Sequence, residues 1–244
     1  MVPVRTAMLL AAGLGLRMRP LTEHTPKPLL SLGDRTLLDH MLDRLAESGV
    51  TSVVVNAHWQ AGQIAAHLAA RHGAPDTMLR QEADLLDTGG GVAAALAEGK
   101  LGGDAFFVAN SDNLLLDGPV PALRRMQTAL DASVDAVILV HRTFQVHSDI
   151  GAGDFFLDPW GAPRRRRERE IAPYVFAGIT LATPALFAAL PGEKFSMNNV
   201  WDRAMAAGRL RAVVHDGLWF HLSRPDDLAE AEHALATQLT GVTT

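Results

Sequence analysis

The chain has 244 residues, 48% of them hydrophobic, with a formal net charge of −5 and no cysteine. This length and apolar content suit one large α/β domain with a well-buried core. The absence of thiols excludes a disulfide framework and a thiolate metal site, and the negative balance argues against general nucleic-acid binding. No apolar run approaches the roughly 20 residues that cross a bilayer, and the first residues show no signal-peptide pattern. We therefore expect a cytoplasmic protein with no membrane or nucleic-acid partner.

Along the first part of the chain, apolar strand patterns alternate with helical patterns, as βαβ units require. The predicted strands are 6–12, 51–56, 77–81, 104–110 and 134–140. The predicted helices are 36–48, 59–71, one opened by Gly89, and 119–131. This order predicts a Rossmann-like α/β fold with three α/β/α layers and a doubly wound, mainly parallel sheet, whose core is completed by residues 134–140.

After residue 140 the pattern changes to shorter elements. The predicted strands here are 153–157, 174–181 and 211–215, and the predicted helices are one near 184–190, one at 198–207 and a C-terminal one at 225–238. No linker is long enough to mark a boundary, so we predict a single domain over 1–244. Within it, we assign residues 1–140 to a nucleotide-binding half and 141–222 to an acceptor half.

Residues 8–29 combine an apolar strand, a glycine-rich turn, an arginine in that turn and a lysine between two prolines. Where the strand stops, small residues let backbone N–H groups approach phosphate oxygens. Arg17 adds positive charge to the turn, and Pro26 and Pro28 present Lys27 from a stiff segment. These features predict a triphosphate site. The strand end and turn residues expected to contact the nucleotide are Leu10, Ala11, Ala12, Gly13 and Gly15.

A second block, Glu82 to Gly91, ends in three consecutive glycines. Bare backbone at Gly89 and Gly90 can lie against a flat ligand. The alternative is a flexible turn before a helix, with Thr88 or Asp87 as the N-cap, and both interpretations can hold together.

A third block places Asn110 and Asp112 at the carboxyl end of the strand 104–110. Ligands bind at this end of the strands in open α/β sheets. Mg²⁺ prefers carboxylate oxygens and retains waters while it bridges phosphates. We therefore expect Asp112 to bind a metal ion and Asn110 to contact the nucleotide, against the alternative that Asp112 only caps a turn.

The pattern G-x-G-x-R-x-x-P-L-T-x-x-x-P-K-P, from Gly13 to Pro28, resembles the signature of the sugar-1-phosphate nucleotidyltransferases. The DTGGG block, the segment Gly153-Asp154-Phe155 and the segment Phe176–Ile179 resemble bacterial N-acetylmuramate-1-phosphate uridylyltransferases in particular. The resemblance implies that a nucleoside triphosphate, expected to be UTP, and a sugar 1-phosphate react to form an NDP-sugar and pyrophosphate, in cell-wall sugar recycling. Mannose- and heptose-1-phosphate guanylyltransferases share the first two blocks. The alternative of GTP with mannose or heptose 1-phosphate therefore stays open.

The resemblance also implies roles for individual residues. Arg17 is expected to hold the leaving β/γ end of the triphosphate, and Lys27 the α-phosphate or the sugar phosphate. Glu82 is expected to read the edge of the base above a floor of Gly89 and Gly90. For the sugar phosphate, the candidates are Gly153, Asp154, Gly178 and Lys194. The sequence favours no particular oligomeric state.

Two segments depart from the family pattern. Relatives often carry W-x-D-x-G-T, whose Asp is a second metal ligand, where this chain has Trp219 to Arg224 with His221 in the acidic position. If His221 is a ligand beside Asp112, the expected cofactor shifts from Mg²⁺ toward Mn²⁺ or Co²⁺, because imidazole suits those ions better. Otherwise His221 packs beside Trp219. The departure at this segment also leaves open a function of another class, that of a regulatory protein that binds a nucleotide sugar and has reduced turnover.

The second departure is the absence of the family's E-K-P lysine. In its place stands a run of charges, Arg164 to Glu170. Such a run is typical of a solvated loop or of an edge strand guarded against aggregation. The alternative is that one arginine reaches the sugar phosphate, since a guanidinium fork suits phosphate.

Overall fold

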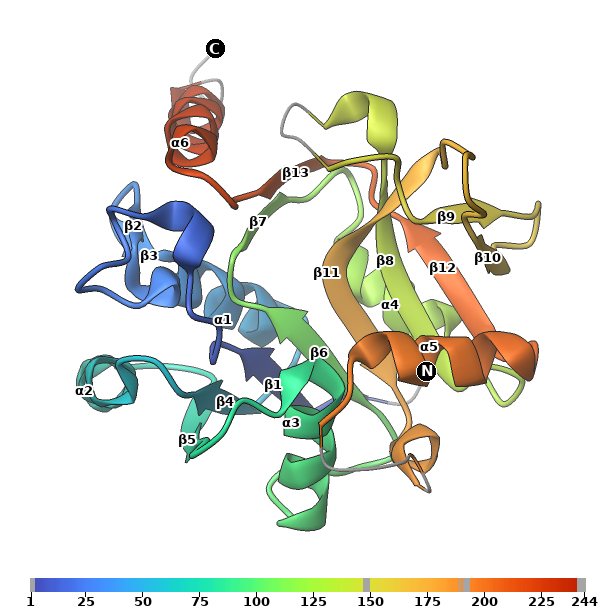
Figure 1. The fold of residues 1–244 in the computed structure, drawn as a ribbon, viewed down its shortest axis with the longest axis horizontal. Helices are drawn as coiled ribbons and strands as arrows, with labels where there is room; N and C mark the ends of the chain where they lie inside the picture. The colour runs from blue at the N-terminus through green and yellow to red at the C-terminus, as the bar shows by residue number, and fades with distance from the viewer. Residues whose placement is uncertain (1–2, 147–149, 189, 191–193, 241–244) are drawn as a thin grey trace.

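The structure is a computed structural model, which describes residues 3–146, 150–188, 190 and 194–240 (Figure 1). Its centre is a nine-stranded sheet. The strands of this sheet are β1 (Thr6–Leu10), β4 (Ser52–Ala57), β5 (Asp76–Gln81), β6 (Phe106–Asn110), β8 (Ala136–Arg142), β9 (Phe155–Leu157), β10 (Pro163–Arg165), β11 (Tyr174–Ala182) and β12 (Leu210–Val214). Two further pairs are β2 (Ser31–Leu32) with β3 (Arg35–Thr36), and β7 (Asn113–Leu116) with β13 (Leu218–His221).

The described α-helices are α1 (Leu37–Glu47), α2 (Ala61–Ala70), α3 (Asp87–Ala97), α4 (Ala122–Ala129), α5 (Met197–Ala206) and α6 (Pro225–Thr240). Short 3₁₀ helices are η1 (Leu16–Met18), η2 (Lys27–Leu29), η3 (Thr143–Gln145) and η4 (Pro184–Phe187). None of the helices in the described residues is long and apolar enough to cross a bilayer.

Alternation along the strands divides the core into two layers. On β4, Val53 and Val55 join the cluster that packs against α1, α2 and α4, whereas Val54 joins the cluster that packs against α3 and α5. Successive strand side chains point to opposite faces of a sheet, so both faces of this one are covered by helices. The predicted Rossmann-like three-layer fold is confirmed.

The parallel part of the sheet is smaller than predicted. Strands β5, β4, β1 and β6 are parallel neighbours, but β8 does not continue this block. Instead β11 lies between β6 and β8 and is antiparallel to both (Figure 1). The prediction that 134–140 completes the parallel core is therefore wrong. The described residues between β8 and β11 form no α-helix, and a connection without a crossover helix allows antiparallel pairing.

The helix predicted near 184–190 is also wrong in type. Only Pro184–Phe187 forms a helical turn, of the 3₁₀ kind, and Ala188 is already extended, while residue 189 lies outside the described residues. In the sequence this segment stands between Pro184 and Pro191, which leaves room for little more than one turn. Most other predicted elements are present, with ends shifted by a few residues.

A third hydrophobic cluster connects α6 to the opposite end of the chain. Leu228 and Ala231 of α6 pack with Met18, Leu32 and Leu222. Met18 belongs to η1, which follows the glycine-rich turn. The C-terminal helix therefore supports the back of that turn.

Candidate active site

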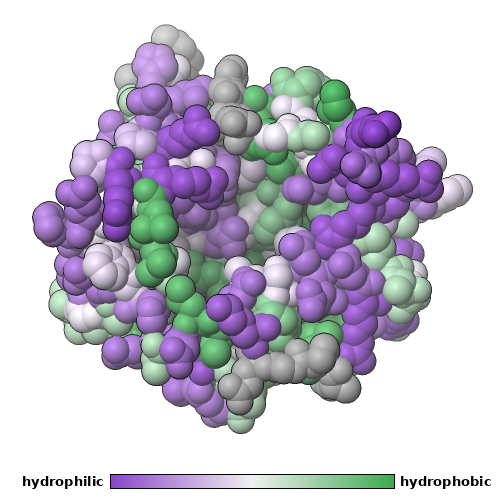
Figure 2. All heavy atoms as spheres, in the orientation of Figure 1, coloured by the Kyte–Doolittle hydropathy of each residue, from purple (hydrophilic) through white to green (hydrophobic). Residues whose placement is uncertain are grey.

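A cavity of about 680 Å³ opens at the carboxyl ends of the parallel strands. Leu10 ends β1, Asn56 lies at the end of β4, Glu82 follows β5 and Asn110 ends β6, and all four line it. The face seen in Figure 2 is hollowed near its middle, where hydrophobic and hydrophilic residues both reach the surface. This is the edge at which open α/β sheets bind ligands.

Most of the sequence-predicted site residues meet in this first cavity. Its lining includes the predicted residues Leu10, Ala11, Ala12, Gly13, Gly15, Arg17, Lys27, Glu82, Asn110, Asp112 and Lys194. Arg17 lies in η1 and is exposed at the cavity wall. The hydroxyl of Thr22 donates to the carbonyl of Gly15 over 2.7 Å, which ties the two ends of the turn together.

Lys27 and Asp112 form an ion pair across the cavity. The distance from Lys27 Nζ to Asp112 Oδ2 is 2.7 Å, and the two side chains are 10% and 27% exposed. Lys27 is presented by η2, which Pro26 and Pro28 flank and stiffen. The sequence predicted both residues but not their direct contact. The other carboxylate oxygen, Asp112 Oδ1, is buried and has no hydrogen-bond partner among the described residues.

Glu82 is held by a buried hydrogen-bond chain that begins at the glycine-rich turn. The backbone N–H of Ala11 donates to Asn56 Oδ1 over 2.9 Å, and Asn56 Nδ2 donates to Glu82 Oε1 over 2.9 Å. Arg80 also donates to Glu82 Oε1, over 3.2 Å. Sequence reasoning missed Asn56, although a polar residue at the end of the apolar run TSVVVN was an available signal. The chain fixes Glu82 relative to the turn.

Gly89 and Gly90 do not line either cavity described here. Both of their backbone N–H groups donate to the carbonyl of Phe195 over 2.9 Å. A Cβ on Gly89 would lie 2.5 Å from the Phe195 ring. The small size of Gly89 thus serves the packing of α3 against the chain before α5, and the predicted role of both glycines as a floor for the base stays a prediction.

Gly178 likewise makes room for a protein side chain. It has φ +82°, and a Cβ there would lie 1.8 Å from Asn113 Nδ2. Asn113 directly follows Asp112, is 2% exposed, and has no hydrogen-bond partner for its side-chain atoms among the described residues. Any side chain at position 178 would displace the side chain of Asn113. The structure therefore places Gly178 against Asn113, the neighbour of Asp112 in the chain, and not in either cavity lining.

His221 lies beside Asp112 on the neighbouring strand. Pairing of β13 with β7 sets His221 opposite Asn113, and its ring stacks on Trp219 with centroids 5.8 Å apart. Burial lowers the pKa of His221 below its usual value; the charges of Lys27 and Arg17 act in the same direction, while Asp112 opposes them. A neutral imidazole can be a metal ligand.

The donor set at this point fits a divalent cation that takes part of its coordination from substrate. The described residues contain no group of three or more acidic or histidine side chains suited to a metal, so a site made of protein ligands alone is not formed there. A single carboxylate with an unpartnered oxygen, Asp112, suits Mg²⁺, which usually takes one or two carboxylates plus substrate phosphates.

A second cavity of about 280 Å³ adjoins the first and shares Leu10, Thr88 and Asn110 with it. Its wall has an aromatic side formed by Phe176 and Trp201. Asp154, a predicted sugar-phosphate residue, lines it and accepts a hydrogen bond from the N–H of Phe176 over 2.8 Å. Gly153, shortly before β9, is buried. Its carbonyl accepts a hydrogen bond from Arg166 Nε over 3.1 Å.

One charged residue of the run Arg164 to Glu170 lines the second cavity, namely Arg165. The run was predicted to be a solvated loop or an edge-strand guard, with the alternative that one of its arginines reaches the sugar phosphate. The sequence did not single out Arg165. Strand β10 does stand at the end of the sheet order, so part of the run is an edge strand. Because strand side chains alternate, one arginine of such a run can face inward while its neighbours face solvent.

The chain matches the family model of the MobA-like NTP transferase domain over residues 7–165. N-acetylmuramate alpha-1-phosphate uridylyltransferase from Caulobacter vibrioides is 38% identical over 95% of this chain and 97% of its own. The protein of the same name from Neisseria meningitidis is 32% identical over 93% of this chain and 96% of its own. A probable mannose-1-phosphate guanylyltransferase from Oryza sativa is 31% identical over 91% of this chain and 62% of its own.

Solved structures show the same fold at low sequence identity. UDP-glucose pyrophosphorylase complexed with UDP-glucose superposes with a TM-score of 0.77 and 14% identity, covering 96% of this chain and 99% of that one. HddC from Yersinia pseudotuberculosis complexed with GMP-PN superposes with a TM-score of 0.73 and 17% sequence identity. This match covers 95% of this chain and 100% of that one. With the family match over most of its length and the predicted motif at the strand ends, the chain belongs to the MobA-like NTP transferase family and is a nucleotidyltransferase.

Proposed function

We propose that this enzyme transfers the uridylyl group of UTP to N-acetylmuramate 1-phosphate, forming a UDP-sugar and releasing pyrophosphate. The observation that carries the proposal is the meeting of Arg17, Lys27, Asp112 and Glu82 around one cavity at the carboxyl ends of the parallel strands. The choice of substrates rests on the two uridylyltransferase relatives, which match this chain over nearly its whole length. Because this reaction consumes a nucleoside triphosphate, we assign it to the cytoplasm.

The hydrogen bonds of Glu82 favour uracil as the base. Its Oε1 already accepts from Asn56 and Arg80, and Oε2 accepts no hydrogen bond within the described part of the chain. An ionised carboxylate acts only as an acceptor. One remaining oxygen matches the single imide N–H of uracil, whereas guanine presents adjacent N–H donors that suit a carboxylate with both oxygens available.

The two adjoining cavities support an in-line reaction. The nucleotide occupies the first cavity and the sugar the second, so that the 1-phosphate meets the α-phosphorus near Asp112. An oxygen of the 1-phosphate attacks this phosphorus, the bond to pyrophosphate breaks on the opposite side, and the electron pair leaves with pyrophosphate. A phosphate monoester has a second pKa of about 6, so the attacking oxygen is anionic at neutral pH and needs no general base.

The charged side chains then reduce repulsion between the two polyanionic substrates. Arg17 holds the leaving pyrophosphate end, and Lys27 neutralises charge on the α-phosphate or on the sugar phosphate. Lys194, at the same cavity wall, adds positive charge for the acceptor phosphate. Asp112, with His221 beside it, would hold a divalent cation, which when bound neutralises charge on the phosphates.

A second candidate function is guanylyl transfer to mannose or heptose 1-phosphate. The mannose-1-phosphate guanylyltransferase relative favours it, although that match covers less than two thirds of the relative. A third candidate is a regulatory protein that binds the nucleotide sugar without turnover, because His221 stands in place of an acidic residue.

The test is pyrophosphate release with four nucleoside triphosphates and a set of sugar 1-phosphates, in Mg²⁺ and in Mn²⁺. We expect the highest kcat/KM with UTP and N-acetylmuramate 1-phosphate. A preference for GTP with mannose 1-phosphate would support the second candidate. Tight binding of the UDP-sugar without pyrophosphate release under any condition would support the third.

A further inference from the structure

Arg165 is the only cationic side chain among the described residues that line the second cavity. It belongs to β10, and its side chain is 34% exposed. It does not line the first cavity, where Lys27, Arg17 and Lys194 gather. Positive charge is therefore present at two separated places, one at the proposed phosphate end and one at the sugar end.

The guanidinium of Arg165 is fixed on two sides. Its Nε donates to Asp202 Oδ1 over 2.7 Å, and its Nη2 donates to Asn198 Oδ1 over 2.9 Å. It also lies over the rings of Phe155 and Trp201, with distances of 5.2 and 5.8 Å from Cζ to the centroids. These contacts hold the planar group in one orientation, which lowers the entropy lost when it binds a ligand.

One part of the guanidinium is left without a partner. Nη1 makes no hydrogen bond within the described part of the chain, although an arginine side chain carries five N–H donors. Asp202 is 57% exposed, so its pairing with Arg165 is a solvent-exposed contact of low energy and does not prevent a second anion from binding. A positioned guanidinium with free N–H donors suits a carboxylate.

We propose that Arg165 binds the lactate carboxylate of N-acetylmuramate 1-phosphate and so selects a sugar 1-phosphate that carries a second negative group. This inference rests on the proposed function. The 1-phosphate must lie toward Asp112 and Lys27 in the first cavity, so a cation that lines only the second cavity meets another part of the sugar. Asp154 in the same wall would repel a carboxylate, and the charge of Arg165 offsets this repulsion.

Arg164 provides a matched control on the same strand. It faces away from the cavity, pairs with Glu170 over 2.8 Å and lies 3.9 Å over the ring of Phe156. Arg164 thus has the same charge, an acidic partner and an aromatic neighbour, but lines neither cavity. Replacing it changes the net charge of the protein by the same amount as replacing Arg165 and likewise removes an ion pair of β10.

The experiment compares Arg165→Gln, Arg165→Lys and Arg164→Gln at saturating UTP. For each variant, kcat/KM is measured with N-acetylmuramate 1-phosphate and with N-acetylglucosamine 1-phosphate, which lacks only the lactate group; if the latter is not turned over, its inhibition constant is used. We expect Arg165→Gln to lose about tenfold to a hundredfold with the muramate substrate, mainly in KM, and little with the other sugar. Arg165→Lys keeps part of the preference, and Arg164→Gln keeps all of it.

An equal loss for both sugars in Arg165→Gln, or an equal loss in Arg164→Gln, would overturn the role of Arg165. Failure of the proposed function is separate from this result, because it would appear in the unaltered protein as no turnover of N-acetylmuramate 1-phosphate. Calorimetric titration with N-acetylmuramate 1-phosphate gives a readout without turnover. Binding of this probe that is weakened in Arg165→Gln but not in Arg164→Gln supports the inference, and equal binding contradicts it.

Discussion

At the residue scale, Lys27 and Asp112 form a partly buried ion pair. The gain from such a partly buried pair is offset by the cost of removing both charges from water. Moving the ammonium away leaves the Asp112 carboxylate without its partner, which is unfavourable unless another positive charge replaces it. We therefore expect Lys27 to turn toward the phosphates only when a divalent cation takes its place at Asp112.

Replacing Lys27 by Ala should lower turnover about a hundredfold, which corresponds to roughly 3 kcal/mol of transition-state stabilisation from a charge in a phosphate site. The fold should persist, because the neighbouring prolines and η2 do not depend on the ammonium. Pyrophosphate release at saturating substrates measures the loss, and thermal unfolding serves as the control. Near-normal turnover of this variant would remove Lys27 from the catalytic group.

Glu82 should control the choice between UTP and GTP. Removing its carboxylate leaves the base edge without its acceptor and Asn56 without one partner, so selectivity falls. We expect Glu82→Ala to reduce the ratio of kcat/KM for UTP over GTP by about tenfold or more. The matched control is Glu98→Ala, because Glu98 also pairs with Arg80 but lies outside both cavities. The same ratio in both variants would show that Glu82 does not read the base.

His221 should influence which metal ion supports turnover. If it is a ligand, replacing it by Asp restores an oxygen donor and raises activity in Mg²⁺ relative to Mn²⁺. The alternative is that His221 only packs against Trp219, with Asp112 alone holding the ion through waters. The ratio of kcat in Mg²⁺ to kcat in Mn²⁺, measured for the parent and for His221→Asp, separates the two. An unchanged ratio would contradict the role as a ligand.

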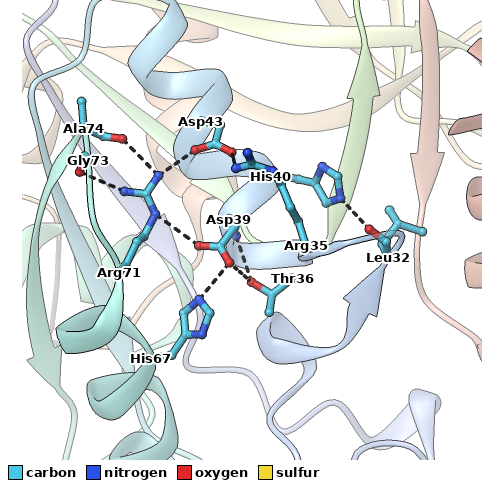
Figure 3. Close-up of polar contacts among 10 residues, drawn as sticks. All are labelled: Leu32, Arg35, Thr36, Asp39, His40, Asp43, His67, Arg71, Gly73 and Ala74. Carbon is cyan, nitrogen blue, oxygen red and sulfur yellow. Dashed lines mark hydrogen bonds and ion pairs between the residues drawn. The ribbon is translucent and has the colours of Figure 1, made fainter. Parts of the chain in front are cut away.

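At the scale of elements, α1, α2 and the loop that follows α2 are joined by a polar network (Figure 3). Arg71 donates to Asp39 Oδ1 over 3.2 Å and to Asp43 Oδ1 over 2.7 Å. His67 of α2 contacts Asp39 Oδ2 over 2.9 Å, and Arg71 also bonds the carbonyls of Gly73 and Ala74. Asp39 is thus shared by both helices and lies away from the residues that line the cavities.

Acid should weaken this network through Asp39. Burial raises the pKa of Asp39, but hydrogen bonds from Thr36 and His67 and the charges of His67 and Arg71 outweigh burial, so its pKa lies below the usual 3.8. A carboxyl with a lowered pKa stabilises the fold above its unfolded value and loses this contribution as pH falls through the folded value. We expect Asp39→Asn to cost roughly 1–3 kcal/mol of unfolding free energy near pH 6.

The difference in unfolding free energy between the parent and Asp39→Asn should shrink when urea unfolding is measured at a pH below about 4. Asp39 of the parent then becomes protonated and loses its charge. The control is Asp34→Asn, since Asp34 is exposed and makes no ion pair within the described part of the chain. A difference that stays constant down to pH 3 would show that the charge of Asp39 does not stabilise the network.

The sequence predicts elements well where the signal is local. Apolar runs such as 51–56 match β4, and the 3.6-residue pattern of 36–48 matches α1. It does not predict β7 and β13, which are only four residues each and exist because they pair across a separation of about a hundred residues. The insertion of β11 between β6 and β8 is similarly a long-range choice that no local pattern encodes.

In the candidate site too, residues with a local signal were predictable, whereas residues that depend on long-range contacts were not. The turn at Gly13, Lys27 and Asp112 were predictable because a strand end, glycines and flanking prolines carry their chemistry locally. Asn56 was missed, and Arg165 was not singled out within its charged run, because their positions in the site come from what other elements place beside them. Gly178 was predicted as a site residue, but its neighbour Asn113 comes from a strand more than sixty residues earlier, so its supporting position was not readable.

At the scale of the whole molecule, the nine-stranded sheet contains strands from both proposed halves. Several strand pairings join the halves: β11 pairs with β6 and β8, β12 pairs with β8, and β13 pairs with β7. In the first of these, Ile179 to Ala182 lie opposite Ala109 to Phe106. One cluster of the core also includes residues of both halves, among them Leu9 and Leu181. Shared hydrogen bonds and shared packing are what make two segments of a chain unfold together.

The single domain predicted from the sequence should therefore unfold in one transition. Leu9→Ala in β1 and Leu181→Ala in β11 form a matched pair, one in each half, since both leucines are fully buried and belong to the same cluster. Each should lower the unfolding free energy by about 2–5 kcal/mol.

Far-UV circular dichroism reports on the whole chain, whereas tryptophan fluorescence is weighted toward the second half through Trp160, Trp201 and Trp219. During urea unfolding, the transition followed by circular dichroism and the transition followed by fluorescence should have the same midpoint within each variant. If Leu181→Ala moved the fluorescence transition ahead of the circular dichroism transition while Leu9→Ala did not, the two halves would be separate folding units and the single-domain prediction would be wrong.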